Sequence, residues 1–143
     1  MMQRHPALRS FSNEHHRGLE LARRARKAAT QETTSQAAAW EAVRKIFRTE
    51  LEPHFQREEQ GLLPVLRVAG EIGKVDRTVR EHRSMHFLVL EDNVDNLALF
   101  AEALTNLIRF EENELFDTAQ RVLGYKVLDD LEQVLNNGDQ VVE

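Results

Sequence analysis

Residues 52–64 read EPHFQREEQGLLP, in which His54 is followed four and five positions later by Glu58 and Glu59. Residues 107–116, LIRFEENELF, repeat the glutamate pair without the histidine. Around both stretches, apolar residues recur every three or four positions, which is the spacing of an amphipathic helix. The two stretches therefore predict helices that carry acidic and imidazole groups on otherwise apolar faces.

This helical spacing extends over nearly the whole chain, which has only three prolines and six glycines to interrupt it. A first helix is expected after a cap at Ser10 or Ser12. The polar segment 30–36, TQETTSQ, is the first expected connection, and a second helix is expected from near Ala37. Pro53 falls inside this second helix, where it is expected to cause a kink because proline cannot donate a backbone hydrogen bond.

The second helix is expected to stop at Pro64 and Gly70, and a third to begin near Lys74. The stretch 96–110, NLALFAEALTNLIRF, contains no residue that breaks a helix and so marks no boundary. The turn to a fourth helix is placed at about residues 92–97. Four amphipathic helices with short links predict an all-α fold, an antiparallel up-down-up-down four-helix bundle.

Length and composition bound the function of the chain. Its 143 residues predict a single domain over residues 1–143, with a core of about residues 5–125 and a helical C-terminal tail at 126–143. The absence of cysteine excludes disulfides, thiolate zinc sites, iron–sulfur clusters and cysteine nucleophiles. Any metal must therefore bind to oxygen and nitrogen ligands.

The charges and apolar runs argue against nucleic-acid and membrane functions. Basic residues gather in residues 1–27 and acidic residues beyond position 90, a pattern we attribute to attraction between neighbouring helices. The chain is acidic overall, whereas nucleic-acid binding favours a basic domain. No apolar run is long enough for a membrane span, and Glu14 and Glu20 argue against a transit peptide. We expect no nucleic-acid or membrane partner and a cytoplasmic location.

Each apolar stripe carries polar residues near its middle. They are His15 on the first helix, His54 and Glu58 on the second, His82 and His86 on the third, and Glu111 on the fourth. A buried carboxylate is costly unless it takes up a proton or contacts a cation. A single histidine on such a stripe is more often a hydrogen-bonded core residue than a metal ligand.

Spacing strengthens the metal hypothesis. His54 and Glu58, like His82 and His86, are separated by four residues, so each pair points from one helix face towards the same volume. Imidazole ligands suit iron, copper, nickel and zinc, and added carboxylates favour iron or manganese. The alternative is a bundle with a polar, hydrogen-bonded interior.

Four motifs in order, EHH (14–16), PHFQREEQGLLP (53–64), EHRSMH (81–86) and FEENELF (110–116), resemble the hemerythrin-like proteins with an HHE cation-binding domain. The resemblance covers about residues 5–125. It implies an antiparallel four-helix bundle that holds two non-haem iron ions, bridged by oxygen and two carboxylates. Members of this family bind or sense dioxygen, store iron, or respond to iron and redox state.

The resemblance also implies roles for individual residues. His15 is the expected ligand on the first helix, with His16 as the alternative; His54 binds one iron, Glu58 bridges, and His82 and His86 form the third-helix pair. Glu111 is the second bridging carboxylate, or Glu112 if the helix carries a one-residue bulge. Glu59, Glu112 and Glu114 are expected to be surface acids or outer partners of the ligands, and Glu59 is able to orient a ligating histidine through its other ring nitrogen.

The fourth helix departs from the family pattern, because Leu107 stands where the family has a histidine. This departure implies either an open coordination position or a second metal held weakly or not at all. His5 remains, and is expected to be a surface residue before Pro6.

These observations predict a metal-binding protein that binds or senses dioxygen, nitric oxide or iron. The expected cofactor is iron, with zinc, nickel or manganese as alternatives, and the expected partners are a metal ion or a small diatomic ligand. The chain is expected to act as a monomer or homodimer. An oxidoreductase acting on peroxide or nitric oxide, and a structural bundle with a degenerate metal site, remain as alternatives.

Overall fold

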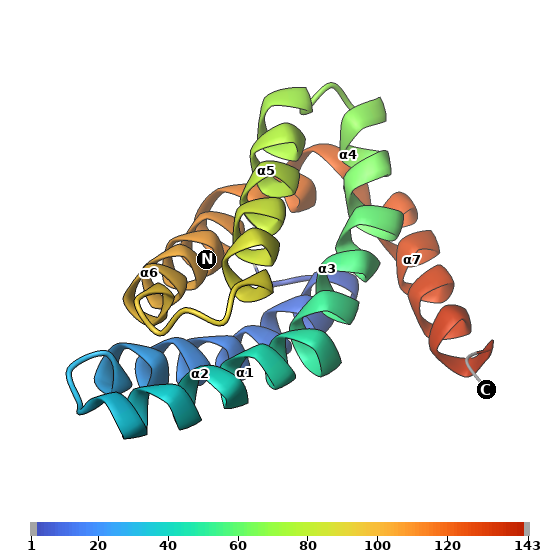
Figure 1. Ribbon diagram of the computed structural model, residues 1–143. Helices are drawn as coiled ribbons and strands as arrows, with labels where there is room; N and C mark the ends of the chain where they lie inside the picture. Colours follow the sequence, from blue (N-terminus) through green and yellow to red (C-terminus); the bar gives the residue numbers. More distant parts are fainter. Residues whose placement is uncertain (1–2, 142–143) are drawn as a thin grey trace.

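A computed structural model describes the backbone of residues 3–141 and the side chains of residues 3–136, with four long helical segments joined by short links (Figure 1). The first segment is α1 (Pro6–Ala28). The second runs through α2 (Thr33–Ile46), η1 (Phe47–Leu51), α3 (Glu52–Arg57), η2 (Glu58–Leu62) and α4 (Leu63–Val68). The third is α5 (Ile72–Leu90), and the fourth runs through α6 (Asn96–Phe110), η3 (Glu111–Leu115) and α7 (Phe116–Val141). Residues 3–141 contain no strand, so the predicted all-α four-helix bundle is confirmed.

Two helix boundaries differ from the prediction, and a third agrees with it. The first helix begins at Pro6 rather than after Ser10 or Ser12, because the His5 side chain caps it: His5 Nδ1 accepts a hydrogen bond from the Ala7 amide at 3.0 Å. The second segment begins at Thr33, so the first link is shorter than expected. The turn after α5 spans residues 91–95 and agrees with the predicted region.

Three wide, π-helical turns interrupt the second and fourth segments. In η1 and η2 the closing bonds run from the Glu52 amide to the Phe47 carbonyl and from the Leu63 amide to the Glu58 carbonyl. Each of these turns is followed by a proline at the second position of the next helix. A proline ring clashes with the carbonyl four residues earlier, and a widened turn accommodates that clash.

The second segment therefore bends instead of ending at its prolines. It changes direction between α2 and α4 (Figure 1), and continues to Val68 before Gly70, whose φ of 95° ends it. The expected bend at Pro53 is present. Of the two residues expected to close the helix, Gly70 ends it, whereas the chain stays helical through Pro64.

The third wide turn, η3, has no proline after it. It begins at Glu111, as η2 begins at Glu58, so both copies of the repeated acidic phrase open a π-helical turn. In both turns the first glutamate and the leucine four residues later are buried. The repetition in the sequence thus corresponds to a repeated local geometry that buries one carboxylate on each of two segments.

The polar residues lie between two hydrophobic cores. One core includes Trp40, Phe47, Phe55, Met85, Phe100, Leu104 and Leu107, and the other includes Leu8, Phe11, Leu62, Leu66, Val75, Leu115 and Phe116. On the fourth segment, for example, Glu111 separates Leu107 of the first core from Leu115 of the second. The same order holds on the second segment, where Glu58 separates Phe55 from Leu62. Apolar packing on both sides therefore shields the middle of the bundle from water.

The C-terminal part of α7 packs back onto the bundle. Gly124 has a φ of 76°, which interrupts the helix, and Leu131 beyond it is buried. The helix approaches Gly61 so closely that an added Cβ there would lie 3.3 Å from the Leu131 side chain. His5 is 5 % exposed, and its Nε2 lies 2.8 Å from Asp129 Oδ1, so the expectation that His5 is a surface residue is wrong.

Within residues 3–141, no helix combines the length and the apolar character needed to cross a lipid bilayer.

Candidate metal centre

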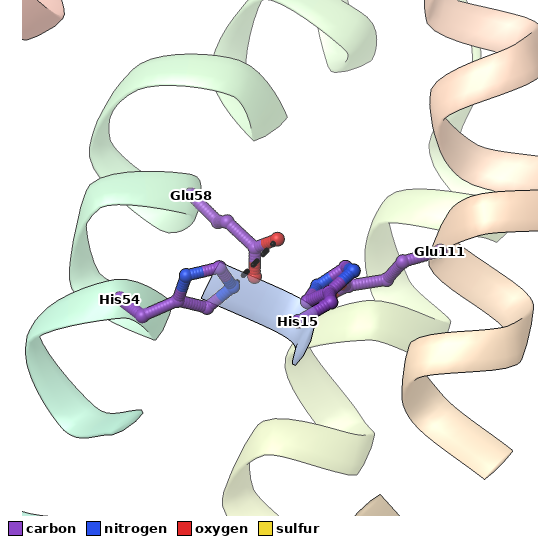
Figure 2. A group of neighbouring side chains, drawn as sticks. All are labelled: His15, His54, Glu58 and Glu111. Carbon is purple, nitrogen blue, oxygen red and sulfur yellow. Dashed lines mark hydrogen bonds and ion pairs between the residues drawn. The ribbon is translucent and has the colours of Figure 1, made fainter. Parts of the chain in front are cut away.

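Four buried side chains from three helical segments meet in the middle of the bundle (Figure 2). His15 comes from α1, His54 and Glu58 from α3 and η2, and Glu111 from η3. One donor atom from each lies within 4.8 Å of the donor atoms of the others. Because His54 and Glu58 are one helical turn apart, they reach this point from the same face of their segment.

A fifth side chain, His82 of α5, lies against the far side of the two carboxylates. On the near side, His15 Nε2 is 2.8 Å from Glu111 Oε1, and His54 Nε2 is 3.4 Å from Glu58 Oε2. On the far side, His82 Nε2 is 3.1 Å from Glu58 Oε1 and 3.5 Å from Glu111 Oε2. Each carboxylate therefore presents one oxygen to the His15–His54 pair and the other to His82.

Several buried atoms of this cluster form no hydrogen bond among the described side chains. They are His54 Nε2, His82 Nε2, both carboxylate oxygens of Glu58 and Glu111 Oε2. A buried polar atom without a partner costs roughly 1–3 kcal/mol, and more if it is charged. A cation on the near side would give His54 Nε2 and Glu58 Oε2 a partner, while His82 Nε2 lies within ion-pair distance of Glu58 Oε1 and Glu111 Oε2 on the far side. The near-side donor set therefore fits a metal ion.

A carboxylate outside the cluster holds each of the three histidine rings. The contacts join His15 Nδ1 to Glu112 at 2.6 Å, His54 Nδ1 to Glu14 at 2.7 Å, and His82 Nδ1 to Glu59 at 2.7 Å. A carboxylate accepts, so Nδ1–H donates, and Nε2 is left facing the interior of the cluster. Metal-ligating histidines commonly have this arrangement, because it fixes the tautomer and the ring orientation.

Sequence reasoning foresaw only part of this outer set. The expected contact of Glu59 with a histidine ring is present. Glu14 was missed as a partner of His54, although it directly precedes His15. Its side chain crosses from α1 to α3, and spacing along one helix does not predict a contact between two helices.

Burial and the neighbouring charges shift the pKa values of the cluster. Burial lowers the pKa of His15, but hydrogen bonds to Glu111 and Glu112 outweigh it and raise the value to about 9. Burial likewise opposes the charge on His82, but its three carboxylate neighbours raise its pKa to about 11.

The two central carboxylates differ from each other. Burial disfavours the charge on Glu58, but His54 and His82 hold its pKa below its usual range. Burial and repulsion from Glu58 raise the pKa of Glu111. Protons on the histidines thus balance the buried negative charge when no metal is bound, and metal binding would release them.

Three candidate residues lie outside the cluster. His16 and His86 are exposed, and Glu112 contacts His15 from outside instead of pointing into the centre. The expectation that His86 points inwards with His82 is wrong, since the buried stripe of α5 continues from His82 to Met85, three residues on. The fourth segment does carry the bulge that would have favoured Glu112, yet Glu111 is the buried residue.

Leu107 lies one turn before Glu111 and is 1 % exposed. It belongs to the first hydrophobic core together with Phe55 and Met85. The fourth segment therefore brings a carboxylate to the centre but no imidazole.

Comparison with known proteins agrees with this geometry. The family model described as the hemerythrin HHE cation-binding domain matches residues 6–119, which is most of the chain and includes every residue of the cluster. Neither the curated proteins nor the solved structures include a match. The chain belongs to the hemerythrin HHE cation-binding domain family.

Proposed function

We propose that the protein binds iron at the His15–His54–Glu58–Glu111 cluster and uses it to bind or sense a small diatomic ligand, dioxygen or nitric oxide. The observation that carries the proposal is the set of buried nitrogen and oxygen atoms without hydrogen-bond partners, which face one another between two apolar cores. Family membership supports a bound cation.

The donor chemistry favours iron over softer or purely nitrogen-bound metals. Two imidazole nitrogens and two carboxylate oxygens resemble the mixed histidine–carboxylate sets that hold non-haem iron with open positions. Iron in such a site supplies a redox-active centre that can coordinate a diatomic molecule. Manganese, zinc and nickel are the competing ions at these donors.

The surrounding residues have two roles, to neutralise the charge of the cation and to orient its imidazole ligands. Glu58 and Glu111 neutralise the charge of the cation in a region from which the two cores exclude water. Glu14 and Glu112 orient the two imidazoles towards the centre.

Two clefts lie beside the central histidines. One, of about 180 Å³, is next to His82 and is lined by Phe47, Glu52, Phe55, Gln56, Glu59, His82, Arg83 and His86. The other, of about 360 Å³, is next to His54 and is lined by Glu14, Arg17, Thr49, Glu50, Leu51, Pro53, His54 and Arg57. Because His54 is one of the proposed ligands, we propose the cleft beside His54 as the entry path for the diatomic ligand.

Metal analysis of protein produced in iron-rich medium tests the proposal. The unsubstituted protein and the control His16→Ala, which removes an exposed histidine, are expected to retain iron. His54→Ala removes a buried donor and is expected to lose it. If the folded, unsubstituted protein carries no metal, the proposal fails.

Thermal unfolding with and without a chelator separates this function from a purely structural bundle. Metal binding to the folded state alone stabilises that state, by about 2.7 kcal/mol when the free metal is at 100 times its Kd. Chelation is therefore expected to lower the Tm. An unchanged Tm in a protein that had bound iron would favour the structural bundle.

The cytoplasmic location and the monomeric or dimeric state stay predictions.

A further inference from the structure

We infer that this chain holds a single metal ion, between His15, His54, Glu58 and Glu111, and that His82 does not hold a second one. The inference rests on the proposed metal-binding function and narrows it. It departs from the two-iron centre that the resemblance implies, and the reason lies in this chain's own residues.

The two sides of the carboxylate pair are unequal in donors. The near side has two imidazole nitrogens, from His15 and His54, in addition to one oxygen from each carboxylate. The far side has a single imidazole nitrogen, from His82, with the other two oxygens. A second ion would therefore have one nitrogen ligand and would share both of its carboxylates with the first ion.

The places from which more ligands would come to the far side are apolar or turned away. Leu107 occupies the fourth segment one turn before Glu111 and is packed in the first core. Phe55 stacks on the His82 ring, with 3.9 Å between the ring centroids. His86 is exposed and lines the cleft beside His82, and its ring centroid is 6.2 Å from that of Phe47.

Glu59 holds the His82 ring without a metal, since His82 Nδ1 lies 2.7 Å from Glu59. His82 Nε2 forms no hydrogen bond, but it lies at ion-pair distances of 3.1 Å from Glu58 Oε1 and 3.5 Å from Glu111 Oε2. His82 is therefore a positioning residue, which holds Glu58 and Glu111 so that their other oxygens face the single ion.

Anaerobic titration of the metal-free protein with ferrous iron, followed by calorimetry and native mass spectrometry, tests the inference. We expect one tightly bound ion per chain. A second ion is expected to bind at least roughly 100-fold more weakly, since even the loss of an outer hydrogen-bond partner weakens metal sites by roughly 10- to 100-fold. Two ions of similar affinity would overturn the inference but keep the proposed function, whereas no bound iron would overturn both.

A matched pair of variants tests the roles of the two histidines. His54 and His82 are both 3 % exposed, and each donates Nδ1–H to a glutamate at 2.7 Å. His54→Ala is expected to abolish stoichiometric binding. His82→Ala is expected to retain one ion per chain, with a Kd raised roughly 10- to 100-fold because a positioning residue is lost. Equal loss of iron from both variants, with helical circular dichroism preserved, would overturn the inference.

A histidine placed on the fourth segment tests whether Leu107 causes the shortage of nitrogen ligands on the far side of the carboxylates. Leu107→His is expected to add a second bound ion, while Leu104→His, another leucine at 1 % exposure one turn further from Glu111, is expected to keep one. A folded Leu107→His protein that still binds one ion would contradict the assignment of the deficit to this residue. If this variant does not fold, the comparison of His54→Ala with His82→Ala still tests whether His82 holds a second ion.

Discussion

In the metal-free protein, the free energy of unfolding is expected to fall as the pH rises from 6.5 to 10. His15 is buried, and its two nitrogens contact Glu111 and Glu112. These contacts favour the protonated ring and raise its pKa to about 9 from the ordinary value of 6.5. The folded protein therefore holds the His15 proton more tightly than the unfolded chain does.

The size of the effect follows from that difference. The interval from 6.5 to about 9 is about 2.5 pH units, and at about 1.4 kcal/mol per unit it corresponds to roughly 3.5 kcal/mol. This stabilisation is fully present below pH 6.5, where the unfolded chain is protonated as well, and is lost as the pH rises through 9. Since domains are stable by only about 5–15 kcal/mol, the loss is easily measured.

Urea unfolding in the presence of a chelator, at pH 6.5, 8 and 10, measures the loss. His15→Gln is expected to remove the part of this fall that comes from His15 and to leave the part that comes from His82, whose pKa is raised to about 11. His16→Gln, at an exposed neighbouring position, is expected to preserve the whole fall. The metal-bound protein is expected to show a smaller change over the same range, because a ligating His15 is already neutral. A stability of the metal-free protein that stays constant or increases between pH 6.5 and 10 would refute the reasoning.

Three further substitutions probe the outer contacts and the packing. Glu14→Gln is expected to weaken iron binding roughly 10- to 100-fold in calorimetry, whereas Glu114→Gln, on an exposed residue, is expected to leave the Kd unchanged. Gly61→Val forces a side chain against the C-terminal part of α7 and is expected to cost about 1–3 kcal/mol in urea unfolding. Gly73→Val, where an added Cβ meets nothing, is expected to escape this packing cost. Phe116→Ala removes a fully buried ring stacked on His15 and is expected to cost about 3–5 kcal/mol.

The fold was predictable where one periodic pattern ran through a whole helix. The stripe from Trp40 through Phe47, His54 and Glu58 to Leu62 is buried throughout. Pro53 and Pro64 each follow a wide turn that accommodates the proline ring without ending the helix. The buried residues therefore stay on one face of the segment. Spacing alone therefore brought His54 and Glu58 to the interior.

The prediction failed where neighbouring helices decide which residues are covered. Helical spacing places Leu19, four residues after His15, on the same stripe of the first helix, but Leu19 is 40 % exposed, while Gly18 beside it is buried against Ile108. His86 failed for the same reason, because both Met85 and His86 are compatible with helical spacing after His82. A single sequence gives the period of a helix but not the width of the face that its partners cover.

The geometry of the fourth segment was only partly visible in the sequence. No proline marks η3, and the only local indication was the repetition of the glutamate pair of η2. The sequence shows that Leu107 stands where the family has a histidine. The shortage of nitrogen ligands beside His82 also depends on the exposure of His86, which the sequence did not reveal.

The central claim is that buried imidazole and carboxylate groups from three helical segments bind a common cation. Anomalous diffraction from crystals of the iron-loaded protein tests it most directly. The account predicts one anomalous peak, about 2.0–2.2 Å from Nε2 of His15 and of His54 and from one oxygen each of Glu58 and Glu111, the distances usual for imidazole and carboxylate ligands. Iron found only at exposed histidines such as His16 and His86, with no peak between the two cores, would contradict it.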